Sequence, residues 1–273
     1  MNKRKKKVAN KVYALLTILV LLVFAFPFFW MLLASFKTQA QIMSTDSLLF
    51  FKPTTNNYLS VFEEHDFLKY IWNSLIVAMG STLLSLLLGL PAAYAIARHS
   101  LHKLGLIILV ARIIPGITFL IPWFILFSQL KLVDTYAALI LSHMLVGLPF
   151  IIWIMISFFD GLPMEIEEAG LIDGCTRHQV FMRVILPISG PGIITASLLS
   201  FIFSWNNFMF SIILAGDKTK PLPVAVFNFM SYSEINWGGL MAAACIITLP
   251  VLIIALLAQR YVVSGLSAGA VKG

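Results

Sequence analysis

Long apolar stretches dominate the chain, and polar residues are confined to the short segments between them. A helix needs about 20 apolar residues to cross the roughly 30 Å hydrocarbon core of a bilayer. Six stretches reach about this length, at residues 12–36, 68–97, 104–128, 135–159, 185–215 and 238–259. The period-two alternation of a membrane β-barrel is absent from them. The pattern therefore predicts an all-α integral membrane protein with six transmembrane helices.

The basic residues indicate the orientation of these helices. The net charge of +7 arises largely from the run Lys3 to Lys7, directly before the first apolar stretch, which favours a membrane-flanking anchor over nucleic-acid binding. With the N-terminus inside, 12 of the 19 Lys and Arg residues, the run Lys3 to Lys7 included, fall on the cytoplasmic side, 6 fall on the outer side and Arg112 lies within the membrane, so both termini are predicted to be cytoplasmic. The first stretch exceeds the roughly 7–15 residues of a signal-peptide core, which favours a retained helix; a cleaved signal, ending near Ala34 and Ser35, is the alternative.

The residue content excludes several energy sources. No Asp or Glu lies within the six stretches, and His143 is the only histidine there; a lone membrane histidine is more often a packing donor than a proton relay. No Gly-Lys dipeptide occurs, so a phosphate-binding loop is absent.

The spans also lack the paired catalytic groups that a membrane-embedded enzyme would need. Cys175 and Cys245 lack metal-ligand spacing, so we expect reduced thiols and no metal site.

The loop at residues 160–184 is the only sizeable one on the predicted cytoplasmic side. Pro163, three glutamates and Gly174 are typical of a short helix with its start and stop signals, and Thr176 with Gln179 is a candidate capping box for a second helix. Helical spacing places a set of residues on one face of the first helix: Ile166, Ala169, Gly170 and Asp173. Either a partner protein docks on this face or the face packs on the protein's own helix ends.

This loop resembles a known element. Glu168-Ala169-Gly170, Asp173-Gly174-Cys175 and Leu186-Pro187 closely resemble the Glu-Ala-Ala loop of permease subunits in binding-protein-dependent ABC importers. Further segments are similar to the carbohydrate branch that contains the six-span maltose-type permease subunit: Asn73-Ser74-Leu75, residues 91–95, residues 204–208 and the tail 265–273. The family often has Ala at the positions of Gly170 and Cys175. It often has an acidic residue where this chain has Asn207, and the missing charge weakens the inference from the family that this position contacts the substrate.

The resemblance implies a fold and a set of partners. It implies that residues 1–273 form a single permease domain of the type I ABC importer fold, in a bacterial-type cytoplasmic membrane. Loop 160–184 would insert into a cytoplasmic ATPase dimer that binds the ATP and Mg, so this chain would hold no cofactor and catalyse nothing itself. A second, different permease and an extracytoplasmic solute-binding protein would complete an importer for sugars or sugar derivatives. The residues implied to couple to the ATPase are Glu168, Ala169, Gly170, Asp173, Gly174, Leu186 and Pro187.

Two places within the membrane are candidates for the substrate path. Arg112 lies inside the third stretch, just before the helix-interrupting Pro115 and Gly116; it either lines the path or pairs with the partner permease. Trp205, Asn206 and Asn207 combine an aromatic ring with amide groups suited to sugars, or they serve helix packing. The alternative function is a stand-alone facilitative carrier, which usually shows two repeated halves that are not found here.

Overall fold

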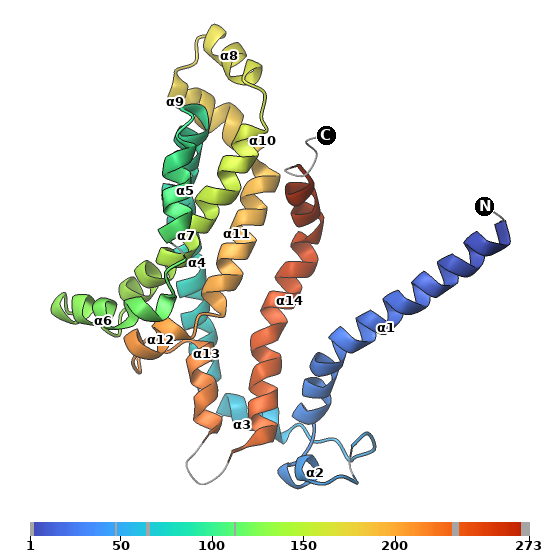
Figure 1. Ribbon diagram of the computed structural model, residues 1–273. Helices are drawn as coiled ribbons and strands as arrows, with labels where there is room; N and C mark the ends of the chain where they lie inside the picture. The colour runs from blue at the N-terminus through green and yellow to red at the C-terminus, as the bar shows by residue number, and fades with distance from the viewer. Residues whose placement is uncertain (1–2, 47, 64–65, 112, 231–234, 269–273) are drawn as a thin grey trace. The chain divides into compact units, whose positions relative to one another are not determined.

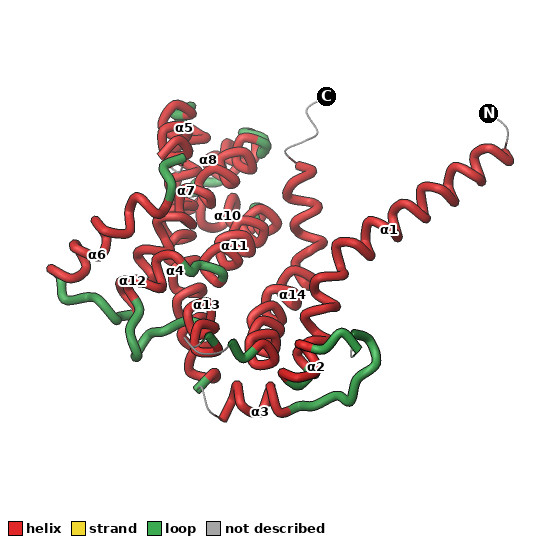
Figure 2. The backbone as a smooth tube through the Cα atoms, turned by 60° about the horizontal axis from the view of Figure 1, so that its bottom comes forward, coloured by secondary structure: helices red, strands yellow, loops and turns green. Residues whose placement is uncertain are grey.

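The computed structural model describes residues 3–46, 48–63, 66–111, 113–230 and 235–268. Figure 2 shows that helices dominate these ranges and that they hold no strand, apart from an isolated bridge between Met230 and Ile235. The chain forms two compact units. One unit comprises Met1–Phe67 with Val226–Thr248, and the other comprises Leu68–Ala225 with Leu249–Gly273.

The first unit contains a long helix with an exposed apolar surface. It holds helices α1 (Lys3–Ser35), α2 (Gln39–Met43), α3 (Asn56–Glu63) and η3 (Val226–Phe229), together with the first part of α14 (Trp237–Ala268). In the most apolar part of α1, within Asn10–Ser35, no residue is buried. A helix that is apolar on all sides requires lipid or another protein around it, so α1 has the properties of a membrane span.

The second unit is built around α4 (Phe67–Arg98), α7 (Tyr136–Asp160) and α11 (Gly190–Trp205). Figure 1 shows α7 and α11 side by side, with α5 (His102–Ala111) along α7. Their shared core takes residues from all three of the main helices, including Ala93, Ile151, Met155, Phe159 and Ala196. A second core cluster joins α4 and α7 to α6 (Leu120–Gln129) and α12 (Met209–Leu214).

Close contact between α7 and α11 depends on Gly192. A Cβ atom at Gly192 would lie 2.6 Å from Cδ2 of Phe158, much closer than van der Waals contact. We expect Gly192→Ala to destabilise the protein by about 1–3 kcal/mol, because the packed ring has to move. Thermal unfolding in detergent measures the loss. Gly190→Ala is the matched control, since no atom lies within 4 Å of a Cβ there, and an equal loss in both variants would contradict the packing argument.

The helices fall at most of the predicted spans. Four helices are long and apolar enough to cross a membrane: Asn10–Ser35, Phe67–Arg98, Tyr136–Asp160 and Trp237–Leu257. A fifth candidate is the pair Arg177–Ile188 and Gly190–Trp205, which is bent by 76°. A single helix over 104–128 is not found, because α5 ends at Ala111 and the chain continues as η1 (Gly116–Phe119) and α6. The break coincides with Pro115 and Gly116, so a total of six spans stays a prediction.

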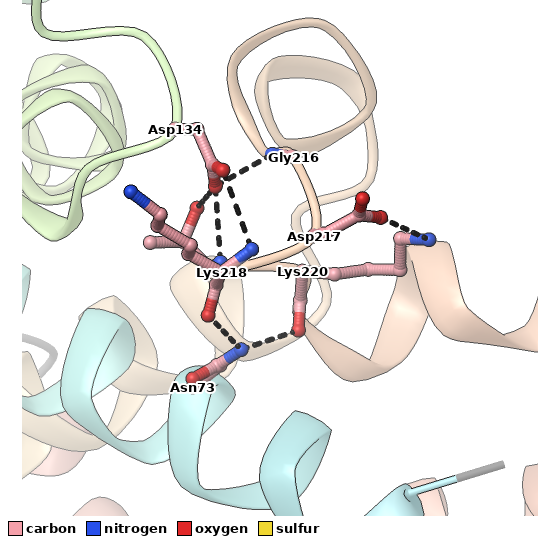
Figure 3. A network of polar contacts seen from close by, with 7 residues as sticks. Asn73, Asp134, Gly216, Asp217, Lys218 and Lys220 are labelled. Atoms are coloured by element: carbon pink, nitrogen blue, oxygen red, sulfur yellow. Dashed lines mark hydrogen bonds and ion pairs between the residues drawn. The ribbon is translucent and has the colours of Figure 1, made fainter.

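The segment that follows α12 is held by one carboxylate, shown in Figure 3. Asp134, between α6 and α7, accepts hydrogen bonds from the backbone N–H groups of Gly216 (2.9 Å), Lys218 (3.3 Å) and Thr219 (3.0 Å), and from the Thr219 hydroxyl (2.8 Å). Asn73 of α4 donates to the carbonyls of Lys218 and Lys220. The segment is therefore tied to α4 and to the α6–α7 connection.

This network makes stability depend on pH. Burial raises the pKa of Asp134, but the hydrogen bonds from Thr219, Gly216 and Lys218 outweigh it and lower the pKa below the usual value. A lowered pKa means that the stabilisation is complete above about pH 4 and is lost as the pH falls through the folded-state pKa.

We expect Asp134→Asn to destabilise the protein by about 1–2 kcal/mol at neutral pH, because the charged acceptor is lost at a partly exposed site. Thermal unfolding as a function of pH measures this, and the difference from wild type should shrink below about pH 4. Asp217→Asn is the control, because Asp217 is exposed and its ion pair with Lys220 spans 3.9 Å. A pH-independent difference would contradict the role given to the carboxylate.

Candidate functional site

The loop singled out by the sequence forms a helical projection at the end of α7 and α11 (Figure 1). Its first helix, α8 (Glu165–Ile172), begins after Pro163 and carries Glu165, Glu167 and Glu168 in its first turn, where carboxylates interact favourably with the helix dipole. Its C-terminal cap is completed by Gly174, two residues after Ile172, and the φ of +85° at Gly174 suits glycine. The N–H of Cys175 donates to the Gly170 carbonyl and that of Gly174 to the Leu171 carbonyl, which is a Schellman end.

The second helix starts with the predicted capping box. In α9 (Arg177–Val180), the Thr176 hydroxyl accepts from the N–H of Gln179, and the Gln179 side chain accepts from the N–H of Thr176. The helix continues as a π-helical turn, η2 (Phe181–Ile185), and as α10 (Leu186–Ile188). The 76° bend before α11 follows at Ser189. We call residues 165–188 the α8–α10 projection; it continues directly into the helix that packs on α7.

The two faces of α8 have different neighbours. Gly170 is buried, and a Cβ there would lie 3.1 Å from Cγ2 of Val180, so α8 packs on α9 at this residue. Ala169 and Asp173 are exposed, as is Glu168. The face predicted from spacing is therefore divided between internal packing and a free surface. Ile172, next to it, is 86% exposed and gives this surface an apolar tip.

The other coupling candidates lie at the ends of the projection. Gly174 is exposed at the turn between α8 and α9. Leu186 is half-buried against the core at the base, and Pro187 beside it is exposed. The base of the projection is thus part of the packed unit, while its turn and the outer side of α8 are accessible.

A buried ion pair anchors α8, and the sequence analysis did not identify it. The guanidinium Nε of Arg98, the last residue of α4, pairs with Oε1 of Glu167, and the two side chains are 9% and 11% exposed. Arg98 also donates to the carbonyls of Phe159 (2.9 Å), in the last turn of α7, and of Leu162 (3.4 Å), just after α7. Tyr94 donates to the other Glu167 oxygen at 2.7 Å. We call Tyr94, Arg98 and Glu167 the anchor; it ties α8 to the ends of α4 and α7.

The substrate-path candidates lie at the break between α11 and α12. Trp205 is buried and its ring stacks on Phe201, with 5.6 Å between the centroids. Asn206 is exposed, and its amide donates to the Ile202 carbonyl at 3.0 Å. The Asn207 side chain accepts from the N–H of Phe210 at 3.1 Å and thereby caps α12. Trp205 thus packs inward while Asn206 lies on the surface. Arg112 lies outside the described residues.

Comparison with protein families identifies the chain. Residues 85–268, which include the projection and the α11–α12 break, match the model of the family described as "Binding-protein-dependent transport system inner membrane component". The chain belongs to this family. The resemblance inferred from the Glu-Ala-Ala-like loop is thereby confirmed, and this permease is an integral membrane component of an ABC transport system.

Relatives extend the match to the full length. This permease is 37% identical over 264 residues to the trehalose/maltose transport system permease protein MalG of Thermococcus litoralis, covering 94% of each chain. It is 33% identical to the diacetylchitobiose uptake system permease protein DasC of Streptomyces coelicolor, covering 98% of this chain and 100% of the relative. A chain of a bacterial ABC transporter for alginate import superposes with a TM-score of 0.81 at 21% identity, covering 96% and 99%. This superposition supports the type I importer permease fold.

Proposed function

We propose that this chain is one of two permease subunits of an ATP-driven importer for sugars or sugar derivatives in a bacterial-type cytoplasmic membrane. The observation that carries the proposal is the α8–α10 projection, which is accessible on one side and rigidly anchored on the other. The preference for sugars is supported by the relatives, which are permease proteins for trehalose/maltose, diacetylchitobiose and sulfoquinovosyl glycerol.

The outer side of the projection is suited to an ATPase subunit. Glu168 and Asp173 offer carboxylates for ion pairs, Ala169 permits close approach, and Ile172 offers an apolar side chain for a pocket. Such a mixture of an apolar anchor and surrounding polar groups is typical of protein interfaces. In this proposal the ATPase dimer binds the ATP and Mg, and this chain transmits the resulting movement.

The movement can reach the membrane helices by two routes, of which only the first passes through the anchor. One route runs from α8 through Glu167 and Arg98 to the ends of α4 and α7. The other runs along α9, η2 and α10 into α11. Because a buried, multiply hydrogen-bonded guanidinium holds its partners in fixed geometry, α8 should move together with these helices rather than independently of them.

A second permease is part of the proposal. The apolar surface of α1 and the exposed apolar side chains of α4 and α6 provide surface for lipid and for a partner helix. In this proposal a solute-binding protein on the outer side delivers the sugar and sets the specificity; the words "binding-protein-dependent" in the family's description support such a partner.

The test is reconstitution. The chain is expressed with its genomic neighbours, the membrane complex is purified through a tag on this chain, and uptake of radiolabelled trehalose and maltose into proteoliposomes is measured with and without internal ATP. We expect an ATPase and a second membrane protein to copurify, and uptake to require ATP and the solute-binding protein. Uptake by this chain alone, without ATP, would contradict the proposal and support a stand-alone carrier.

A further inference from the structure

The break between α11 and α12 lies against a buried histidine of α7. The break contains Asn206 and Asn207, and Figure 1 shows α12 following the lower end of α11. His143 is 3% exposed, and its Nδ1 lies 2.8 Å from Oγ of Ser204, one residue before the end of α11. Its Nε2 lies 3.2 Å from Oγ of Ser211, in the first turn of α12. One imidazole ring therefore contacts the chain on both sides of the break.

The bond donated by Ser211 determines which atoms around this ring donate and which accept. The Ser211 hydroxyl donates to the Asn207 carbonyl at 2.8 Å, so its oxygen is left to accept from Nε2–H of His143. In a neutral imidazole the other nitrogen, Nδ1, accepts, and its donor is the Ser204 hydroxyl. The Ser204 oxygen in turn accepts from the hydroxyl of Ser81 on α4 at 2.9 Å. Each of these serine hydroxyls then has a donor role, the Ser81 hydroxyl being shared with the Ala78 carbonyl at 3.2 Å, and a neutral ring carries its proton on Nε2.

The participating side chains are all shielded from solvent. Ser81 is 1% exposed, Ser204 6% and Ser211 0%. A broken hydrogen bond at such a site leaves a buried polar group without a partner, so the set forms most stably as a whole. We call Ser81, His143, Ser204 and Ser211 the histidine clasp; it joins α4, α7, α11 and α12.

We propose that His143 is a positioning residue that fixes the geometry of the α11–α12 break and so sets where Asn206 and Asn207 lie along the substrate path. The proposal rests on the proposed function, because only a permease has a substrate path, for which Asn206 and Asn207 are the candidates of the sequence analysis. His143 acts through Ser204 and Ser211 and does not itself contact the sugar. Since α7 also carries the Phe159 carbonyl bound by Arg98, a single helix connects the anchor to the clasp.

Two measurements on the purified complex in lipid nanodiscs test the clasp without ATP or sugar. The first is the ¹⁵N spectrum of complex labelled at histidine; the chain has 5 histidines, and the His143 signals are those lost in His143→Gln. We expect Nδ1 unprotonated and Nε2 protonated at neutral pH. A protonated Nδ1 would overturn the assignment of the bonds.

The second measurement is amide hydrogen exchange in three variants. The Asn amide reaches the position of Nδ1 and the Gln amide that of Nε2, whereas Leu offers neither. We expect His143→Asn to speed exchange in α12 and His143→Gln to speed it at the end of α11, by about three- to tenfold, and His143→Leu to do both. A packing role alone predicts wild-type exchange in the Leu variant. That result, or equal acceleration along residues 148–160, overturns the proposal.

These measurements distinguish a failure of the clasp proposal from a failure of the proposed importer function. Uptake of trehalose and maltose by the wild-type complex tests the importer, whereas the spectrum and the exchange rates test the clasp. If the spectrum and exchange rates show the clasp but neither sugar nor any related saccharide is taken up, the importer hypothesis is wrong, and the positioning role along a sugar path is wrong with it. If uptake is observed and exchange at the break is unchanged in all three variants, the clasp proposal alone fails.

Discussion

Replacing Arg98 by alanine will destabilise the protein by about 3–5 kcal/mol, because Glu167 then stays buried without its cation. The carbonyls of Phe159 and Leu162 lose their donors at the same time. The loss should concentrate at the α8–α10 projection, so the ATPase should no longer copurify. Thermal unfolding in detergent and the yield of ATPase bound to the tagged permease measure the two effects.

The double variant Arg98→Met, Glu167→Met separates the charge effect from packing. Removing both charges leaves no uncompensated ion, so most of the lost stability should return. Glu168→Ala is the matched control, since Glu168 lies beside Glu167 but is exposed, and its loss should be below about 0.5 kcal/mol. If Arg98→Ala unfolds at the same temperature as Glu168→Ala, the anchor does not hold the projection.

Replacing Gly174 by valine will reduce ATP hydrolysis stimulated by the solute-binding protein by about tenfold or more in the reconstituted complex. A β-branched residue at a φ of +85° is strained by roughly 1–3 kcal/mol, and the end of α8 can relieve the strain by unwinding. Unwinding displaces Ile172 and Asp173, which belong to the surface proposed to meet the ATPase. The measurement is ATP turnover per assembled complex.

Gly174→Asn is the control for this variant. Asparagine tolerates the left-handed conformation, and no atom lies within 4 Å of a Cβ at this position, so the backbone alone distinguishes the two variants. Gly174→Asn should therefore keep most of the stimulated hydrolysis. Equal activity of both variants would show that the turn after α8 does not transmit the signal.

The sequence was sufficient to predict the spans that are single helices. An apolar run of about 20 residues has few alternatives to a helix in lipid, since every backbone group must be satisfied within the segment. The stretches at 104–128 and 185–215 were equally apolar yet contain breaks. Pro115 and Gly116 gave a local signal for the first break. The second, at Asn206 and Asn207, depends on side chains capping the helix ends and on contacts with α7, which hydropathy does not encode.

At the candidate site, too, features set by neighbouring residues could be predicted from the sequence, whereas contacts between distant residues could not. The ends of α8 and α9 follow from Gly174, Thr176 and Gln179, whose effects act within a few residues. The anchor joins Arg98 to Glu167, far apart in the chain, so spacing could not reveal it. A partial signal existed, because Tyr94 and Arg98 share a helix face, as do Glu167 and Gly170. The inward packing of Trp205 depends on Phe201 and the surrounding core, whereas its residue type alone left both sugar binding and helix packing open.

If the outer side of α8 couples this permease to ATP hydrolysis, reversing the charge of Glu168 should break the coupling. Glu168 is exposed, so Glu168→Lys should leave folding and membrane insertion unchanged. In proteoliposomes with the solute-binding protein and trehalose or maltose, we expect Glu168→Lys to lose both stimulated ATP hydrolysis and uptake, and Glu168→Gln to keep most of each. Wild-type hydrolysis and uptake in the Glu168→Lys complex would show that the outer side of α8 does not couple the two.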